Sequence, residues 1–349
     1  MRNTILKRAL LTVFITGIVS IATFSQEKEY FVACVGFYNL ENLFDTINSP
    51  DTRDTEFTPE GDSRWTAERY HKKLNDLGKV ISMIGTDITP DGPAVLGISE
   101  IENRGVVEDL IQTGVLKPFG FEIIHRDSPD KRGIDVGMIY QPKYFTPTNV
   151  KSVPLIIEDD STFITRDQLV VSGKLAGEEI HFIVVHWPSR RGGEKRSKPF
   201  RNASGDLSRK IIDSLRNINA EAKVVIMGDF NDNPGDDSMI EHLESTDKKI
   251  KLEEGMLFNP MTELYKKGIG TTAWRDSWSL FDQILLSKPL TNGPESGLSL
   301  LDAFVFNRKF LVQPEGRFEG YPWRTFAGGV YLEGYSDHFP VYCFLYREN

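Results

Sequence analysis

Cysteine is scarce in this 349-residue sequence, where only Cys34 and Cys343 occur. No cysteine directly follows the apolar run near the N-terminus, which argues against a lipoprotein. Neither cysteine belongs to the polar motifs described below, so these motifs offer no thiolate to a metal ion. They also lack a serine in a nucleophile-elbow pattern. The chemistry of these motifs therefore rests on carboxylate, amide and imidazole groups.

Long apolar runs are missing after residue 25, so no later segment is expected to span a membrane. The chain starts with a positive segment, an apolar stretch and a small residue at a plausible cleavage point: Arg2, Lys7 and Arg8, then Ala9 to Phe24, then Ser25. The apolar stretch is shorter than the ~20 residues that a spanning helix needs. We therefore expect residues 1–25 to be a signal peptide, cleaved during export to the periplasm or the medium.

Positive charge is in deficit, because 41 Lys and Arg residues stand against 50 Asp and Glu residues. The net charge of −9 becomes −12 without residues 1–25, since these carry three positive charges and no acid. An acidic protein is a poor general binder of nucleic acid. The segment 189–201 departs from this balance, with a single acid, Glu194, among six basic residues: Arg190, Arg191, Lys195, Arg196, Lys198 and Arg201.

The most informative motif lies in the stretch 224–234, with the sequence VVIMGDFNDNP. Four apolar residues predict a buried strand that breaks at a glycine. Asp229 and Asn231 follow two residues apart, so their side chains point the same way and can converge on one small polar target. Other predicted strands begin or end with polar groups in a similar manner: Asn39, Glu100, His186, Asp282 and the pair Asp337–His338.

These strand-end residues combine carboxylates, amides and imidazoles. Oxygen ligands with few nitrogens favour Mg²⁺, with Mn²⁺ or Ca²⁺ as alternatives, over zinc. Two histidines beside carboxylates supply general acid–base groups and hydrogen-bond donors for a charged transition state. Together these groups indicate metal-dependent hydrolysis of a phosphoester.

The same motifs make the chain resemble the endonuclease/exonuclease/phosphatase superfamily, which includes pancreatic-type deoxyribonuclease, abasic-site endonucleases, sphingomyelinases and inositol-polyphosphate phosphatases. The matching elements follow the family's order from about residue 30 to the end: Asn39, Glu100, His186 in HWPS, Asp229 and Asn231 in GDFN, Asp282, and Asp337 and His338 in SDH. The segments 39–45 (NLENLFD) and 127–136 (DSPDKRGIDV) are similar to a branch of secreted bacterial members.

The resemblance implies a four-layer α/β sandwich of the deoxyribonuclease-I type over a single domain, residues 26–349. Two mixed β-sheets would pack face to face, with helices outside and the catalytic groups at one rim. Apolar stripes predict covering helices at 64–84 and 202–219, and the polar segments 49–61 and 255–279 are expected to be loops near the site. The two cysteines would lie in neighbouring strands. Since a bridge there would be strained, we expect two separate thiols.

The resemblance also implies roles for the metal and the water. Glu100 would be the principal metal ligand, assisted by Asn39 and Asp337. Asp229 would orient or deprotonate the attacking water, and Asn231 would hold a phosphate oxygen. Four other acids are expected to have structural roles instead, bracing either loops or the residues that support the site: Glu41, Glu102, Asp127 and Asp135.

Histidines and arginines are expected to hold the phosphate. His338 would donate to the scissile group while Asp282 fixes its tautomer, and His186 would be a second donor. Arg132 is the expected additional cation. The basic segment leaves the strand that ends at His186, so contact with phosphate is favoured over a merely solvated loop. Its expected contact residues are Arg190, Arg191 and Arg196.

Two classes of phosphoester hydrolase remain open. The leading hypothesis is an exported Mg²⁺-dependent endonuclease that hydrolyses nucleic-acid phosphodiesters by attack of an Asp229-oriented water. The alternative is a phosphatase or phosphodiesterase acting on small or lipid-linked phosphate esters. The basic segment favours the nuclease, whereas the net charge favours the alternative. A non-catalytic binding protein is disfavoured by the intact set of proposed ligands, and no stable protein partner is expected.

Overall fold

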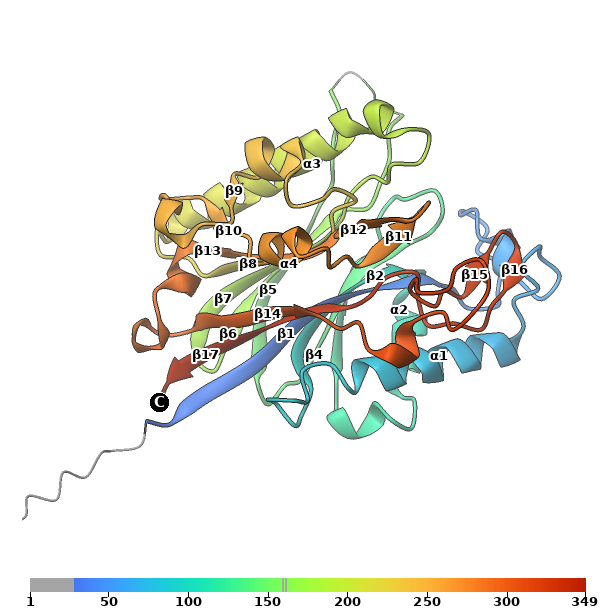
Figure 1. Cartoon of the computed structure of the whole chain (residues 1–349), viewed down its shortest axis with the longest axis horizontal. Coiled ribbons are helices and arrows are strands. Elements are labelled where there is room, and N and C mark those ends of the chain that lie inside the picture. The colour runs from blue at the N-terminus through green and yellow to red at the C-terminus, as the bar shows by residue number, and fades with distance from the viewer. Residues whose placement is uncertain (1–27, 159, 161) are drawn as a thin grey trace, which may run out of the picture.

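The computed structural model describes residues 28–158, 160 and 162–349 (Figure 1). The expected signal peptide, residues 1–25, lies outside these residues. Within the described part of the chain, no helix combines the length and apolar character needed to cross a membrane.

The first β-sheet has six strands in the order β14-β17-β1-β2-β4-β3. Only β1 and β2 are parallel, and every other neighbouring pair is antiparallel, so the sheet is mixed. Its strands are β1 (Tyr30–Leu43), β2 (Pro93–Ile101), β3 (Glu122–His125), β4 (Asp135–Tyr140), β14 (Ser299–Val305) and β17 (Val341–Glu348).

The second sheet has seven strands in the order β5-β6-β7-β8-β13-β10-β9 and is also mixed, because β7–β8 and β9–β10 are its parallel pairs. Its strands are β5 (Phe145–Val153), β6 (Gln168–Leu175), β7 (Glu178–His186), β8 (Val224–Asp229), β9 (Ser245–Thr246), β10 (Leu257–Phe258) and β13 (Asp282–Ser287). Two small hairpins complete the strands: β11 (Thr272–Trp274) with β12 (Ser277–Ser279), and β15 (Phe326–Ala327) with β16 (Val330–Tyr331).

Helices cover the outer faces of both sheets. In Figure 1, α1 (Ala67–Ile81) and α2 (Arg104–Ile111) lie on one side of the molecule, while α3 (Glu194–Ile218) lies on the other. The short α4 (Met261–Lys266) precedes the β11–β12 hairpin. The expected sandwich of two mixed sheets between helices is therefore confirmed.

The alternation of side chains along each strand explains the layers. In β1, Val35 and Phe37 point between the sheets, whereas Cys34 points toward the layer of α1 and α2. In β7, Val184 points between the sheets and Ile183 points toward α3. Because successive residues of a strand face opposite sides, strands that are apolar at every position build two cores at once.

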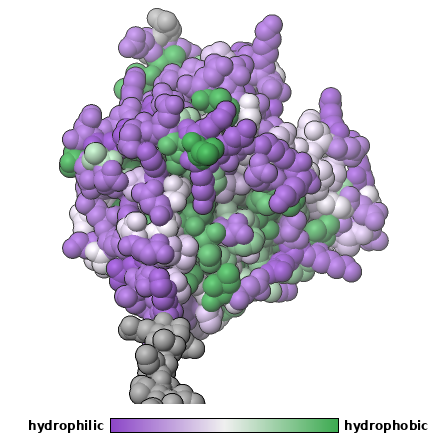
Figure 2. All heavy atoms as spheres, turned by 60° about the vertical axis from the view of Figure 1, so that its left-hand side comes forward, coloured by the Kyte–Doolittle hydropathy of each residue, from purple (hydrophilic) through white to green (hydrophobic). Residues whose placement is uncertain are grey.

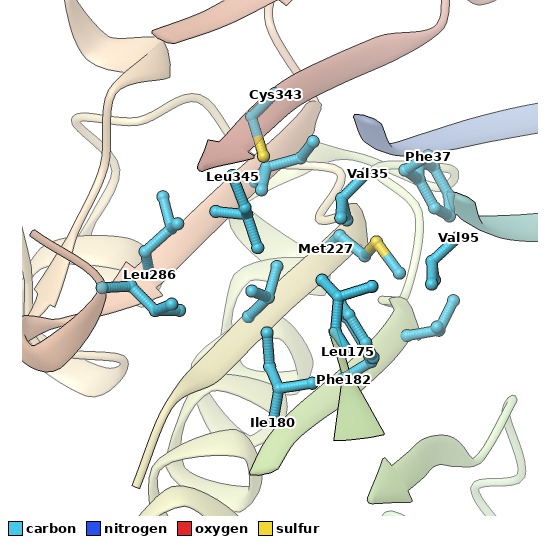
Figure 3. Packing of buried hydrophobic residues seen from close by; sticks show 14 of the residues in the cluster. Val35, Phe37, Val95, Leu175, Ile180, Phe182, Met227, Leu286, Cys343 and Leu345 are labelled. Carbon is cyan, nitrogen blue, oxygen red and sulfur yellow. The ribbon is translucent and has the colours of Figure 1, made fainter. Parts of the chain in front are cut away.

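Figure 3 shows the core between the sheets. Val35 and Val95 come from the first sheet, and Phe182 and Met227 come from the second. All four side chains are fully buried. By contrast, the face in Figure 2 is mostly hydrophilic, with hydrophobic residues confined to small areas. The apolar residues of the strands therefore lie in the interior of the sandwich. Their packing fixes the edges of the two sheets relative to each other.

The two cysteines lie on opposite faces of the first sheet. Cys343 pairs with Val35 in the β1–β17 register and faces the core between the sheets, whereas Cys34 faces the helices. Both are free and fully buried, and burial raises the pKa of each thiol. The prediction of two separate thiols is confirmed, because side chains on opposite faces of a sheet cannot form a disulfide.

The expected helix over 64–84 is present as α1, and Thr66 begins it by accepting a hydrogen bond from the N–H of Arg69. The second helix differs from expectation, because α3 begins at Glu194 rather than at residue 202. Its first turns bury Ser197 and Arg201 instead of apolar side chains, so no apolar stripe marks them. Most of the basic segment is therefore helix. The expected loop over 255–279 also holds three strands and α4.

Candidate active site

Two register shifts shape the site on the first sheet. The register between β1 and β2 shifts after Asn39, and the register between β2 and β4 shifts between Ser99 and Ile101. The intervening Glu100 has φ +59°, a left-handed conformation that is rare for a residue with a side chain. Its Oε2 accepts a hydrogen bond of 3.0 Å from the N–H of Asn42, which is also left-handed. Register shifts of this kind re-aim side chains beside active sites.

Three strands of the second sheet present their polar residues in a row. His186 at the end of β7 is level with Asp229 at the end of β8, and Asp229 is level with Asp282 at the start of β13. The segment before β17 adds His338, whose Nδ1 lies 2.6 Å from Oδ2 of Asp282. Ser336 fixes that segment, because its hydroxyl donates to the Asn39 carbonyl across 2.7 Å and accepts from the His338 N–H.

Asp229 lies at the centre of the site. Its Oδ2 accepts a hydrogen bond of 3.1 Å from Nδ2 of Asn39 in the other sheet. The same oxygen lies 3.5 Å from Nε2 of His186 and 3.9 Å from Nε2 of His338, while Oδ1 accepts from the N–H of Asn231. Burial raises the pKa of Asp229 to about 7, although His338 opposes the rise. A carboxylate with this pKa can accept a proton from water near neutral pH.

The two histidines have opposite electrostatic environments. Burial lowers the pKa of His186 well below the ordinary value, and the nearby Arg166 and Arg132 lower it further. Burial also acts to lower the pKa of His338, but Asp282 and Asp229 outweigh it and raise that pKa well above the ordinary value. His186 is therefore a neutral donor, and His338 is a cationic donor oriented by Asp282.

Asn231 is held in place by backbone and strand contacts. It has φ +52°, and its Nδ2 donates to the carbonyl of Trp187 across 3.1 Å. With Glu100, it is one of two predicted site residues in a left-handed conformation. Such strain persists only where the surrounding structure enforces it, and it concentrates at functional sites.

The donors near Glu100 fit a hard divalent cation. Glu100 and Asp337 offer carboxylate oxygens, with side chains 14% and 31% exposed, and oxygen donors of this kind suit Mg²⁺. Asn39 is buried beside them, although its Oδ1 also accepts from the N–H of Glu41. A second arrangement exists, because Asp229, Asp282 and His338 have ligand atoms within 4.8 Å of one another. Asp282 and His338 of this group are already bonded to each other.

Arg190 is placed differently from expectation. Its guanidinium contacts three acids: Glu194 at 3.0 Å, Asp232 at 2.7 Å and Asp236 at 2.6 Å. It also donates to the carbonyl of Asn231 across 2.9 Å. A guanidinium neutralised in this way holds the loop after β8 in place and has little capacity left for a phosphate. We therefore correct its role from phosphate contact to structural support.

The other predicted arginines keep more freedom. Arg132 is 40% exposed in its side chain, lies 3.8 Å from Asp130 and acts on the pKa of His186. Arg191 and Arg196 are exposed on the connection between β7 and α3 and on the first turn of α3. Of the four acids expected to have structural roles, Glu102 and Asp135 accept hydrogen bonds from loop groups, and Glu41 accepts from β15. Asp127 is 91% exposed in its side chain.

Two buried cations escaped the sequence analysis. Arg166 donates to the carbonyls of His186 and Trp187 and pairs with Asp130 across 3.0 Å. Lys73 of α1 donates from Nζ to Thr325 and to the carbonyl of Tyr335, across 2.6 and 2.7 Å. Neither belongs to a recognisable motif. Only their spacing within apolar patterns, as charged residues at core positions, distinguishes them in the sequence.

Lys73 should be essential for stability. Its Nζ lies 3.9 Å from Oε2 of Glu41, and burial raises the pKa of that carboxyl to about 7 although Lys73 opposes the rise. We expect Lys73→Met to lower the free energy of unfolding by about 3–5 kcal/mol, because it leaves a buried carboxylate without its cation. Lys79→Met, at an exposed position of the same helix, should change it by less than about 0.5 kcal/mol. Urea unfolding of both variants measures the difference, and equal effects would contradict the role of Lys73.

Comparison with known proteins agrees with this geometry. The sequence matches the Endonuclease/Exonuclease/phosphatase family over residues 34–347. No curated protein matches the chain at the level of sequence. Among solved structures, an endonuclease/exonuclease/phosphatase family protein from Bacteroides thetaiotaomicron is similar, with 16% identity and a TM-score of 0.56, covering 92% of this chain and 99% of that one.

Two further structures share the fold. A mannosyl-6-phosphatase from Bacteroides thetaiotaomicron has 17% identity and a TM-score of 0.54, covering 90% of this chain and 99% of that one. TDP2 from D. rerio, complexed with a single strand DNA product, has 14% identity and a TM-score of 0.53, covering 90% and 98%. Identities this low show the fold alone, whereas the family match spans nearly the whole described chain. The chain therefore belongs to the endonuclease/exonuclease/phosphatase family and is a phosphoester hydrolase of that family.

Proposed function

We propose that the chain is an exported, Mg²⁺-dependent endonuclease that hydrolyses phosphodiester bonds of nucleic acid. The observation that carries the hydrolytic part is the convergence of Asp229, His186 and His338 from three separate segments on one small volume. Export rests on the expected signal peptide at 1–25, and the similarity to a secreted bacterial branch rests on the motifs at 39–45 and 127–136.

The environment of each residue determines its role in hydrolysis. Asp229, with its pKa raised to about 7 by burial, orients the attacking water and takes its proton. His338 donates from Nε2 to a phosphate oxygen, because its Nδ1 is bonded to Asp282. His186 donates from Nε2, the nitrogen that faces the carboxylates of Glu100 and Asp229. These donors stabilise the negative charge on the phosphate oxygens while the water oxygen bonds to phosphorus and the P–O bond to the leaving group breaks. The leaving oxygen takes its proton from solvent.

Glu100 and Asp337, with Asn39, would hold the divalent cation. When bound, Mg²⁺ would act as a Lewis acid toward a phosphate oxygen. The left-handed backbone of Glu100 and its hydrogen bond from Asn42 orient the carboxylate. The bond uses Oε2 and leaves the other oxygen, Oε1, available for the cation. Mn²⁺ or Ca²⁺ suits the same oxygen donors.

Positive charge beside the site supports a nucleic-acid substrate. Arg191 and Arg196 are exposed on the segment that follows His186, and such charges contact phosphate backbones. A neighbour in fold, TDP2 from D. rerio, is crystallised with a single strand DNA product. The substrate proposed for this chain, nucleic acid, has the same phosphodiester backbone as that product.

A phosphatase or phosphodiesterase acting on small or lipid-linked esters is the second candidate. The net charge of −12 without residues 1–25 favours it, because an acidic chain repels a long polyanion. The neutralisation of Arg190 by three acids removes one expected backbone contact. Another neighbour in fold is named as a mannosyl-6-phosphatase.

A substrate panel separates the two candidates. The purified chain, residues 26–349, should nick supercoiled plasmid DNA in Mg²⁺ and release little inorganic phosphate from sugar phosphates or inositol phosphates. Excess EDTA should abolish nicking. RNA of similar length tests the choice of nucleic acid, and bis-p-nitrophenyl phosphate serves as a minimal diester. Rapid release of phosphate from small monoesters, with intact plasmid, would establish the phosphatase instead. Hydrolysis of none of these esters would contradict both.

A further inference from the structure

A basic pocket lies beside the candidate active site. Its volume is about 400 Å³, and it is formed by the segment before β6, the connection from β7 to α3 and the first turns of α3. The polar residues that line it are three arginines and three hydroxyl residues: Arg166, Arg191, Arg196, Thr165, Ser189 and Ser197. Among the residues that the structure describes, no acidic side chain lines the pocket. A cavity with this lining is suited to an anion rather than to an apolar ligand.

The charge of the pocket is available to a ligand. Within residues 28–158, 160 and 162–349, neither Arg191 nor Arg196 forms an ion pair with an acid. The contrast with Arg190 is direct, because that neighbour is held by three carboxylates. Glu194, the acid closest in sequence, pairs with Arg190. Two guanidinium groups therefore remain free to make bidentate contacts with a phosphate.

Buried polar groups add to this charge. Thr165 is only 5% exposed, and its Oγ1 has no hydrogen-bond partner among the residues that the structure describes. Unpartnered buried hydroxyls are uncommon in folded proteins and call for a partner. The N-terminus of α3 also opens here, and its N-cap Gly193 provides no side-chain hydrogen bond to the first turn. The free N–H groups of such a helix end attract anions.

The pocket and the catalytic residues share one segment of backbone. Arg166 lines the pocket and donates from Nε and Nη2 to the carbonyls of His186 and Trp187, across 3.2 and 2.7 Å. Asn231 donates to the same Trp187 carbonyl. Pro188, the next residue, is part of the pocket wall. The pocket therefore borders the same short segment of backbone that positions His186 and Asn231.

We propose that this pocket binds a second phosphate group of the substrate while the first is hydrolysed at Asp229 and His338. This inference rests on the proposed hydrolysis of phosphoesters and narrows the substrate class to molecules with at least two phosphates. The second phosphate comes either from the adjacent linkage of a nucleic-acid strand or from another position of a small polyphosphorylated ester. Both present the same tetrahedral anion to Arg191 and Arg196.

Kinetics with matched substrates test the proposal. Arg191→Gln/Arg196→Gln should raise KM for a substrate with a second phosphate about tenfold more than KM for bis-p-nitrophenyl phosphate, which has one. For the nucleic-acid source, 5′-phosphorylated and unphosphorylated thymidine dinucleotides are compared. For the small-molecule source, an inositol bisphosphate and a monophosphate are compared. The pair that shows the discrimination identifies the source.

A charge-matched control accompanies these measurements. Lys195→Gln/Lys210→Gln removes the same charge from exposed positions of α3 that do not line the pocket. It should leave the discrimination between the paired substrates unchanged. If both double variants lost this discrimination equally, the overall positive electrostatic field rather than the pocket would recognise the second phosphate. That result would overturn the proposal. An equal rise of KM on bis-p-nitrophenyl phosphate would overturn it as well.

Binding of pyrophosphate separates this inference from the proposed function. Titration calorimetry of the chain in EDTA should show one binding event fewer in Arg191→Gln/Arg196→Gln than in the control. Thr165→Val should weaken that event severalfold, because it removes the buried hydroxyl and keeps the shape. If the chain hydrolyses no phosphoester but shows this pattern, the anion site stands and the proposed function falls. Pyrophosphate binding that is identical in all variants would overturn the site itself.

Discussion

His338→Ala should lower turnover by about 10²–10³-fold, and Asp282→Asn should lower it within the same range, because each variant disables one oriented donor to the phosphate. The 2.6 Å contact between Nδ1 of His338 and Oδ2 of Asp282 makes the two side chains a single unit. The double variant should therefore be little worse than His338→Ala alone, since groups that act as a unit are not additive. Steady-state turnover of bis-p-nitrophenyl phosphate measures all three variants in saturating Mg²⁺.

The chain contains its own control for this experiment. His125 and Asp135 form a second buried pair, with Nε2 and Oδ2 2.8 Å apart, in which Asp135 also binds Ser128 of the following loop. His125→Ala and Asp135→Asn should lower stability but leave the turnover of the folded fraction within about threefold, as for substitutions outside the reacting groups. If the fold-loss of turnover in the His338 and Asp282 double variant equalled the product of the two single fold-losses, the two side chains would act independently. That result would contradict the proposal that they act as a unit. Comparable loss in the control pair would attribute the effect to folding.

Glu100→Gln should raise the Mg²⁺ concentration needed for half-maximal activity by about tenfold or more, because an amide replaces the principal carboxylate ligand. Asp229→Asn removes the same charge from the same site but should keep metal affinity nearly unchanged. It should lower turnover by about 10²–10⁴-fold through loss of the base. Each substitution nearly preserves the shape of the side chain, so packing differs little between them. Direct binding of Mn²⁺, followed by electron paramagnetic resonance, separates affinity from turnover.

The same pair of variants decides between two metal positions. Asp229, Asp282 and His338 have ligand atoms within 4.8 Å of one another and form a competing cluster. If that cluster holds the cation, Asp229→Asn should lose Mn²⁺ affinity as much as Glu100→Gln does. That result would contradict the assignment of Glu100 and Asp337 as ligands. Full activity of the parent chain in excess EDTA would remove the metal from the proposal altogether.

Local patterns in the sequence were sufficient to predict which strand ends carry polar groups. The buried run predicted that a strand would deliver Asp229, and β8 ends there. Asn231 lies beyond the strand in a left-handed conformation, which the alternation of strand side chains does not describe. His186, Asp229 and Asp282 are level with one another because their strands are neighbours in one sheet. The apolar period of α1 predicted its buried face for the same reason, since each signal lies within one element.

The sequence analysis failed where polar side chains occupy interior positions. The first turns of α3 bury Ser197 and Arg201, so a search for apolar stripes started the helix eight residues late. Arg190 looked like a free cation, yet Asp232 and Asp236 neutralise it from a loop more than forty residues away. Lys73 of α1 was not singled out in the sequence, yet it is 2% exposed.

By itself, the sequence determined the longer buried strands, the apolar stripes of α1 and of the later part of α3, and the identity of the groups at the strand ends, because periodicity and turn signals act over a few residues. Only the tertiary structure decided which charges are free. Arg191 and Arg196 line the pocket and have no ion-pair partner among the described residues. By contrast, Arg190 and Lys73 are bound by partners from distant segments. The reason is physical: the availability of a charge depends on burial and on the nearest opposite charge, and in a sandwich of two sheets both come from residues far apart in the chain.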